Sequence, residues 1–166
     1  KNIINDVKKN KDKSIIKYEK KFNNLKYLKV NKLFFSKNEI EKNIESIGKF
    51  KIFISMAYGM GTSYPVQVIN KPILAEPGSA CTETYLMVGP FTNKKQTNNA
   101  LNYMKTRFFR FCVFLIKNTQ HAAKNVYKFV PMQDFTKDWD DEKLYKKYNF
   151  DSADIDFINS KIREME

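Results

Sequence analysis

The clearest hydrophobic pattern in the chain predicts one long amphipathic helix near the centre. Between residues 95 and 117, apolar side chains recur at intervals of three and four residues, as they do along one face of an α-helix. Polar residues follow abruptly at positions 118–121, so the helix is expected to end there. The residues of the apolar stripe are Ala100, Leu101, Met104, Phe108, Phe111, Cys112, Leu115 and Ile116.

Short strands are predicted on both sides of this helix. Alternating or compact apolar runs are separated by turns rich in Gly, Pro and Asn, which is typical of strands in an antiparallel or mixed sheet. The predicted strands cover residues 51–57, 66–69, 73–75, 84–88 and 126–130. The expected fold class is therefore α+β, with a small antiparallel or mixed sheet packed on one long central helix and with short C-terminal helices.

Shorter helices are predicted outside this central region. Ser36 and Glu39 have the spacing of a capping box, which predicts a helix over residues 37–47. Apolar residues at helical spacing predict two further short helices near the C-terminus. Asp140 and Asp141 precede the first of these, and they are interpreted as its N-cap and as an acid of its first turn.

The composition divides the chain into a basic lead-in and one domain. Residues 1–13 are mostly Lys and Asn, and the pattern over residues 14–28 fits either a short helix or an extended connector. Residues 1–49 are therefore interpreted as a basic linker or helical lead-in. Residues 50–166 are interpreted as a single domain, since the length of the chain allows one domain of ordinary size.

Charge narrows the class of partner. The formal net charge is +12 and the isoelectric point is near 9.6. Residues 50–131 carry 10 Lys and Arg against 2 Asp and Glu, whereas residues 132–166 carry 6 against 10. An AT-rich genome, which encodes Lys and Asn often, is a competing explanation for the lysine excess. The acid-poor centre nevertheless has the charge that a surface facing phosphate needs, which indicates an anionic partner.

Two polar loops carry side chains that commonly recognise DNA, one at residues 58–64 and one at residues 118–128. Arg, Asn and Gln bind base edges, whereas Lys, Thr and Tyr commonly hold phosphates. Contacts to base edges are predicted for Asn118, Gln120 and, as a third candidate, Arg110. Contacts to phosphates are predicted for Tyr58, Lys117, Thr119, Lys124 and Lys128, and His121 is assigned to the same DNA-binding loop.

Structural explanations compete with these assignments. Residues 118–121 also fit a solvated connection between a helix and a strand. The turn at residues 58–61 fits a hairpin-like turn whose glycines adopt positive φ. Arg107 and Arg110 lie three residues apart on the predicted helix, so they either extend from a packed helix or present guanidinium groups to phosphate.

Residues suited to catalysis are sparse. His121 is the single histidine, and neither a phosphate-binding loop nor a Ser-His-acid arrangement is present. We therefore expect no metal site, no cofactor and no catalysis in this chain. One alternative is a nuclease, which would depend on Glu76 and Glu83. Another is a protein-interaction module that docks a partner subunit through Phe108, Phe109 and Phe111.

Cysteine content and hydropathy favour a cytoplasmic location. Cys81 and Cys112 are too few for a disulfide framework, and they are interpreted as reduced packing residues. No apolar run reaches the roughly 18 residues that a membrane-spanning helix needs. A cytoplasmic protein without a membrane partner is therefore expected.

Five stretches of the sequence carry a resemblance to a known family. They are Lys71-Pro72-Ile73-Leu74-Ala75-Glu76-Pro77-Gly78-Ser79, Cys81-Thr82-Glu83-Thr84-Tyr85, Thr106-Arg107-Phe108-Phe109-Arg110-Phe111, Lys117-Asn118-Thr119-Gln120-His121 and Val126-Tyr127-Lys128-Phe129-Val130-Pro131. With them, the region over roughly residues 50–166 is similar to the C-terminal target-recognition region of bacterial restriction-modification proteins, of type II or IIG, that carry an N-terminal adenine-specific DNA methylase domain. A helix followed by a polar loop and a strand is also loosely similar to the recognition domains of type I specificity subunits.

The resemblance implies sequence-specific binding of double-stranded DNA. In the family, a methylase domain precedes this region and supplies a loop for S-adenosylmethionine and an Asn/Asp-Pro-Pro-Tyr/Phe motif. This sequence has no Pro-Pro pair and no glycine-rich cofactor loop. We therefore expect a recognition module separated from its enzyme, with the methylase domain supplied in cis or in trans and S-adenosylmethionine as the cofactor of that domain.

Overall fold

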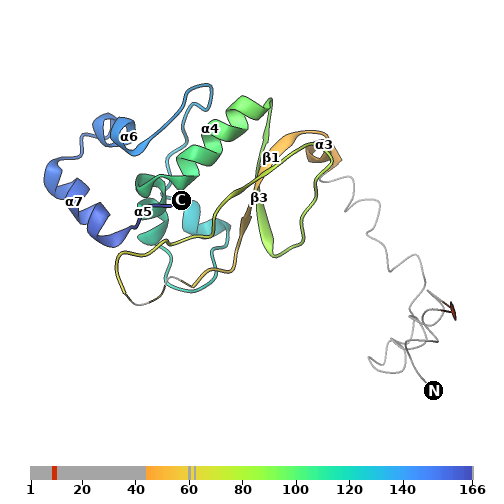
Figure 1. Ribbon diagram of the computed structural model, residues 1–166, viewed down its shortest axis with the longest axis horizontal. Coiled ribbons are helices and arrows are strands. Elements are labelled where there is room, and N and C mark those ends of the chain that lie inside the picture. The colour runs from red at the N-terminus through yellow and green to blue at the C-terminus, as the bar shows by residue number, and fades with distance from the viewer. Residues whose placement is uncertain (1–8, 11–43, 60, 62, 166) are drawn as a thin grey trace, which may run out of the picture. The chain divides into compact units, whose positions relative to one another are not determined.

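The structure is a computed structural model that describes residues 9–10, 44–59, 61 and 63–165 (Figure 1). The chain divides into two compact units, Lys1–Ile44 and Glu45–Glu166. The expectations for residues 14–28 and for most of the helix at 37–47 lie outside the described residues. Helix α3 (Ile44–Ile47) is the described end of that predicted helix.

A three-stranded antiparallel sheet forms one layer of the second unit. Strand β1 (Phe50–Ser55) lies in the middle, between β2 (Ile73–Ala75) and β3 (Tyr85–Phe91). Ile52 pairs with Leu74 on one side and with Val88 on the other. Strand β3 continues through Gly89 and Pro90, where the sequence predicted a stop, because an edge strand tolerates a residue that has no N–H.

The predicted central helix is two helices. Helix α4 (Lys94–Lys105) ends at Thr106, and α5 (Arg107–Phe114) begins there. Thr106 has an extended backbone with ψ of 151°, and its hydroxyl accepts a hydrogen bond from the N–H of Phe109 at 3.1 Å. The prediction of one helix over 95–117 is therefore wrong, because Thr106 acts as an N-cap within an otherwise continuous apolar stripe.

Two predicted strands are also wrong. Residues 66–69 form no strand, since Val68 has φ of 77°, and Val66 makes only an isolated parallel bridge to Ile162. Within residues 126–130, the chain instead completes the 3₁₀ helix η2 (Lys124–Tyr127) and then turns. The α+β class is nevertheless confirmed by the small antiparallel sheet and the surrounding helices.

Both predicted C-terminal helices are present. Helix α6 (Asp141–Lys147) has Asp140 as its N-cap, as predicted, and α7 (Ser152–Lys161) begins with a capping box. Figure 1 shows α6 and α7 at the end of α4 and α5 that lies away from the sheet. The helices therefore extend the core of the second unit beyond the small sheet.

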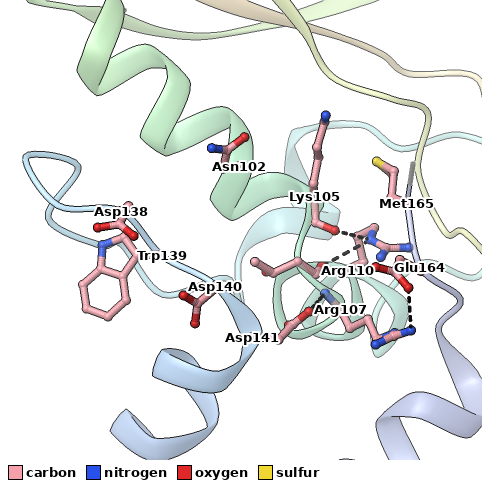
Figure 2. A pocket seen from close by; sticks show the side chains of 11 residues that line it. Asn102, Lys105, Arg107, Arg110, Asp138, Trp139, Asp140, Asp141, Glu164 and Met165 are labelled. Carbon is pink, nitrogen blue, oxygen red and sulfur yellow. Dashed lines mark hydrogen bonds and ion pairs between the residues drawn. The ribbon is translucent and has the colours of Figure 1, made fainter.

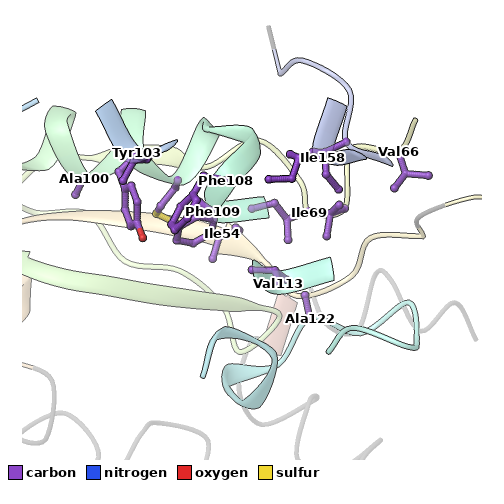
Figure 3. Packing of buried hydrophobic residues seen from close by; sticks show 14 of the residues in the cluster. Ile54, Val66, Ile69, Ala100, Tyr103, Phe108, Phe109, Val113, Ala122 and Ile158 are labelled. Atoms are coloured by element: carbon purple, nitrogen blue, oxygen red, sulfur yellow. The ribbon is translucent and has the colours of Figure 1, made fainter. Parts of the chain in front are cut away.

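The hydrophobic core lies between the sheet and the helices (Figure 3). Ile54 from β1 faces Tyr103 and Phe109, whose rings meet edge to face at a centroid distance of 5.2 Å. Phe108 and Phe109 are only 3% and 5% exposed. Docking of a partner through Phe108 and Phe109 is therefore contradicted, because both side chains are already packed in the core, whereas Phe111, the third residue of that prediction, is half-buried.

The two cysteines occupy different environments. Cys112 is half-buried among core residues, which fits the predicted packing role, whereas Cys81 is exposed and the packing interpretation is wrong for it. Burial raises the pKa of Cys112 to about 11. Over the described part of the chain, no helix is long and apolar enough to cross a bilayer.

We expect Cys81 to be alkylated much faster than Cys112 at neutral pH. Cys81 is accessible, while Cys112 is shielded and its high pKa leaves little thiolate. The measurement is the mass of the intact protein during treatment with iodoacetamide, with Cys81→Ser and Cys112→Ser as the two reference variants. Equal rates in these variants would contradict the packing of α5.

Candidate nucleic-acid interface

The two loops predicted to bind DNA lie side by side. Beyond the end of β1, the N–H of Ala122 donates to the carbonyl of Met56 at 2.6 Å, and the N–H of Tyr58 donates to the carbonyl of Gln120 at 2.9 Å. Ala57 and His121 form an antiparallel bridge between these bonds. The segment that leaves the sheet and the segment that leaves α5 are thus joined by backbone pairing, although about sixty residues separate them in the sequence.

Most of the predicted contact residues are exposed on this paired segment. Thr119 shapes the loop, because its hydroxyl accepts a hydrogen bond from the N–H of His121 at 3.2 Å. The side-chain amides of Asn118 and Gln120 make no hydrogen bond to any described residue, so their donors and acceptors are available to a ligand. Tyr58 is half-buried, and the exposed residues are Asn118, Thr119, Gln120, His121, Lys124 and Lys128.

The turn after β1 approaches the Gln120 side chain closely. A Cβ atom at Gly59 would lie 3.9 Å from that side chain. Gly61 has φ of 74°, as the turn interpretation predicted for this segment, and an L side chain rarely adopts that conformation. Gly61 therefore adopts a backbone conformation that favours glycine, whereas a side chain at Gly59 would only make an ordinary contact with Gln120.

Lys117 is a structural residue of this interface. Its side chain is only 3% exposed, and Nζ donates to the carbonyl of Tyr58 at 2.7 Å. Burial lowers the pKa of this amine. The predicted phosphate contact by Lys117 is therefore corrected, because the amine is buried and bonds the turn at Tyr58 to the end of α5.

Arg110 is also structural. The residue is 1% exposed, and burial lowers its pKa to about 10. Its Nε donates to the carbonyls of Lys105 at 3.0 Å and Thr106 at 3.2 Å. One terminal nitrogen donates to Arg163 at 2.6 Å and to Gln67 at 3.4 Å. The predicted base contact by Arg110 is corrected, because backbone carbonyls from three segments already surround the guanidinium. Figure 2 shows Arg110 beside Lys105, which belongs to one of these segments.

Arg107 has a different environment one turn earlier. Its guanidinium is partly exposed and lies 3.5 Å from the Glu164 carboxylate (Figure 2). The backbone N–H groups of Arg107 and Phe108 donate to Asp141 at 2.9 Å and 2.8 Å. Asp141 was predicted as a first-turn acid of its own helix, but it also caps α5. Sequence spacing could not reveal this role, since the capped helix lies more than thirty residues upstream.

The acids proposed for nuclease chemistry form no hydrogen bond or ion pair with the described residues of these loops. Glu76 forms an exposed ion pair with Lys94 at 2.7 Å, and this hydrogen bond lowers the pKa of the carboxyl. Glu83 is exposed. Among the described residues, no group of three His, Cys, Asp or Glu side chains is arranged to hold a metal ion.

The predicted contact set is therefore reduced to the exposed residues of the paired loops, with Tyr58 at their edge. Lys117 supports these residues from below the surface through its bond to the carbonyl of Tyr58, whereas Arg110 bonds to carbonyls outside the two loops. The arrangement provides the free amides of Asn118 and Gln120 at the backbone-paired segment and two exposed lysines, Lys124 and Lys128, just beyond it. Comparison with family models, with curated proteins and with solved structures finds no match to this chain.

Proposed function

We propose that residues 50–166 bind double-stranded DNA sequence-specifically, as the target-recognition domain of a methylase supplied in cis or in trans. The observation that carries the proposal is the pairing of two exposed loops, one of which presents the free amides of Asn118 and Gln120. A rigid backbone is favourable for reading bases, because a contact geometry that is already formed costs less ordering on binding.

Base reading is assigned to the two amides. The side chains of Asn and Gln can contact N6 and N7 of adenine at the same time in the major groove, and such a pair contributes about 1–3 kcal/mol of discrimination. Thr119 and His121 flank Gln120 and are assigned to nearby polar contacts. This division leaves the amides as the residues that determine sequence preference.

Phosphate contacts are assigned to Lys124, Lys128 and the hydroxyl of Tyr58. Lys124 begins η2 and Lys128 follows it, so both lysines lie just beyond the amide loop. The acid-poor composition of residues 50–131 favours this assignment. Each lysine that neutralises a phosphate contributes about one unit to the dependence of log K on log salt concentration.

Replacement of both amides, Asn118→Ala with Gln120→Ala, is expected to reduce the preference for the cognate duplex over a scrambled duplex. The expected loss is about 1–3 kcal/mol for each bidentate contact removed. The cognate duplex is first selected from a randomised pool with the unaltered chain, and fluorescence anisotropy then measures both affinities at several salt concentrations.

The matched control is Asn98→Ala with Asn102→Ala, which removes two exposed amides from α4. This variant should keep the preference unchanged. If the loop variant also keeps it, the base-reading assignment is wrong. If the unaltered chain binds no duplex even at low salt, the proposed function itself is wrong.

A further inference from the structure

An apolar cavity opens beside the recognition loops. Its volume is about 490 Å³, and its walls come from β3, α4 and the segment 124–135. The lining is formed chiefly by Leu86, Val88, Ala100, Met104, Tyr127 and Phe135. A closely packed protein interior seldom leaves space of this size, so the cavity can accommodate a side chain from another molecule.

Tyr127 leaves an unsatisfied polar atom beside the cavity. Its hydroxyl is buried and has no hydrogen-bond partner in the described structure. Burial raises the pKa of Tyr127 to about 12, so the hydroxyl remains a neutral donor at physiological pH. A buried hydroxyl without a partner is unfavourable by about 1–3 kcal/mol.

Strand β3 borders the cavity and is an open edge of the sheet. Its sequence carries no charge, whereas edge strands usually carry charged residues that prevent pairing with other chains. The N–H of Tyr85 donates within a turn to Thr82. In the part of the chain that the structure describes, the remaining backbone groups of β3 bond to no strand other than β1. A backbone edge is therefore available along residues 86–89.

Exposed methionines border the same opening. Met87 on β3 is 37% exposed, and Met132 on the segment 124–135 is 84% exposed. Methionine side chains adapt to partners of different shape, and they are frequent at surfaces that bind peptides. The open edge, the cavity and these two side chains thus form one continuous surface.

We propose that this surface binds an extended segment of a partner protein. The segment adds a strand to β3 and places one apolar side chain in the cavity, a recognised mode of peptide binding. Lys124 lines the cavity, and residues 50–131 carry 10 Lys and Arg against 2 Asp and Glu, so the segment is acidic at its flanking positions. The same charge disfavours a second copy of this chain as the occupant.

The proposal goes beyond DNA recognition and does not depend on it. The two surfaces share Lys124 alone among the residues assigned above. The surface also differs from the docking site predicted at Phe108, Phe109 and Phe111, since Phe108 and Phe109 are buried and Phe111 does not line the cavity. A partner bound at β3 would leave Asn118 and Gln120 free for other contacts.

The test is selection of short random peptides from a displayed library on the full chain. Enriched peptides are synthesised with a fluorophore, and their affinities are measured by anisotropy. We expect alternating apolar and acidic residues in the enriched peptides. N-methylation of the peptide backbone should weaken binding by about tenfold or more, because it removes the donors that pair with β3.

Two protein variants locate the peptide. Met87→Lys should weaken binding about tenfold, whereas Ile73→Lys should leave it unchanged, since Ile73 is 50% exposed on β2 at the opposite edge of the sheet. Equal weakening by both variants, or no effect of N-methylation, would overturn strand addition at β3. Failure to enrich any peptide would overturn the proposal as well.

Two further measurements distinguish other occupants. The first measurement is binding of a duplex with an extrahelical base. If Met87→Lys abolishes this binding and the peptides do not compete with it, the cavity is assigned to a nucleobase and the proposal is overturned. The second measurement is sedimentation over a range of protein concentrations. Dimers that form with rising concentration and that Met87→Lys abolishes would assign β3 to a second copy of the chain and would also overturn the proposal. If Met87→Lys keeps the preference for the cognate duplex, its effect on peptide binding is independent of the proposed DNA recognition.

Discussion

Arg110→Met is expected to lower the free energy of unfolding by about 3–5 kcal/mol. Methionine fills much of the same space but donates no hydrogen bond, so four backbone carbonyls lose a charged donor. These carbonyls belong to Lys105, Thr106, Gln67 and Arg163, and the change therefore weakens the junction of α4 and α5 together with two distant segments. Equilibrium unfolding in urea measures the loss.

The control for this prediction is Arg107→Met, one turn away on the same helix. Arg107 contacts a largely exposed carboxylate, so its replacement should lower stability by less than about 1 kcal/mol. Arg110→Lys should recover only part of the loss, because an ammonium group cannot reproduce the planar fork of donors. Equal stabilities for the two methionine variants would mean that Arg110 does not connect these segments.

Asp141→Ala should lower the free energy of unfolding by about 2–3 kcal/mol. The carboxylate accepts from two consecutive N–H groups at the start of α5, where an anion also interacts favourably with the helix dipole. Alanine leaves both N–H groups without their acceptor. The same urea titration measures the effect, and circular dichroism checks that the remaining helices are intact.

Asp140→Ala separates the two roles of this acidic pair. Asp140 caps only its own helix, α6, through the N–H of Lys143 at 2.8 Å, and the site is exposed. Its replacement should lower stability by about 1 kcal/mol. A loss at Asp140 as large as that at Asp141 would show that capping of α5 by a distant acid adds nothing.

The apolar periodicity predicted where a helix would lie but not where it would break. The stripe continues on both sides of Thr106, and a single threonine within it resembles any polar position. The break depends on the hydroxyl of Thr106 and on a carboxylate brought close by α6. Periodicity records local preference only, and this cap is formed by tertiary contact.

Prediction of the site was limited for the same reason, because the sequence shows local pattern but not tertiary packing. The position of the polar loop and its basic, amide-rich character could be read from the sequence, and the structure places most of these residues on the surface. Residue type did not distinguish exposed Lys124 from buried Lys117, or Arg107 from Arg110. Burial of a cation depends on carbonyls supplied by other segments, which the sequence does not reveal.

The backbone pairing beyond β1 has a consequence for the proposed DNA-binding surface. Residues 56–58 and 120–122 share hydrogen bonds, and Lys117 attaches the first segment to the end of α5. A foreign sequence placed in one of these two segments would therefore have to keep the hydrogen bonds to the other segment. The fold should therefore tolerate exchange of both segments as a unit more readily than exchange of either one alone, and natural variation is expected to couple them as one cassette.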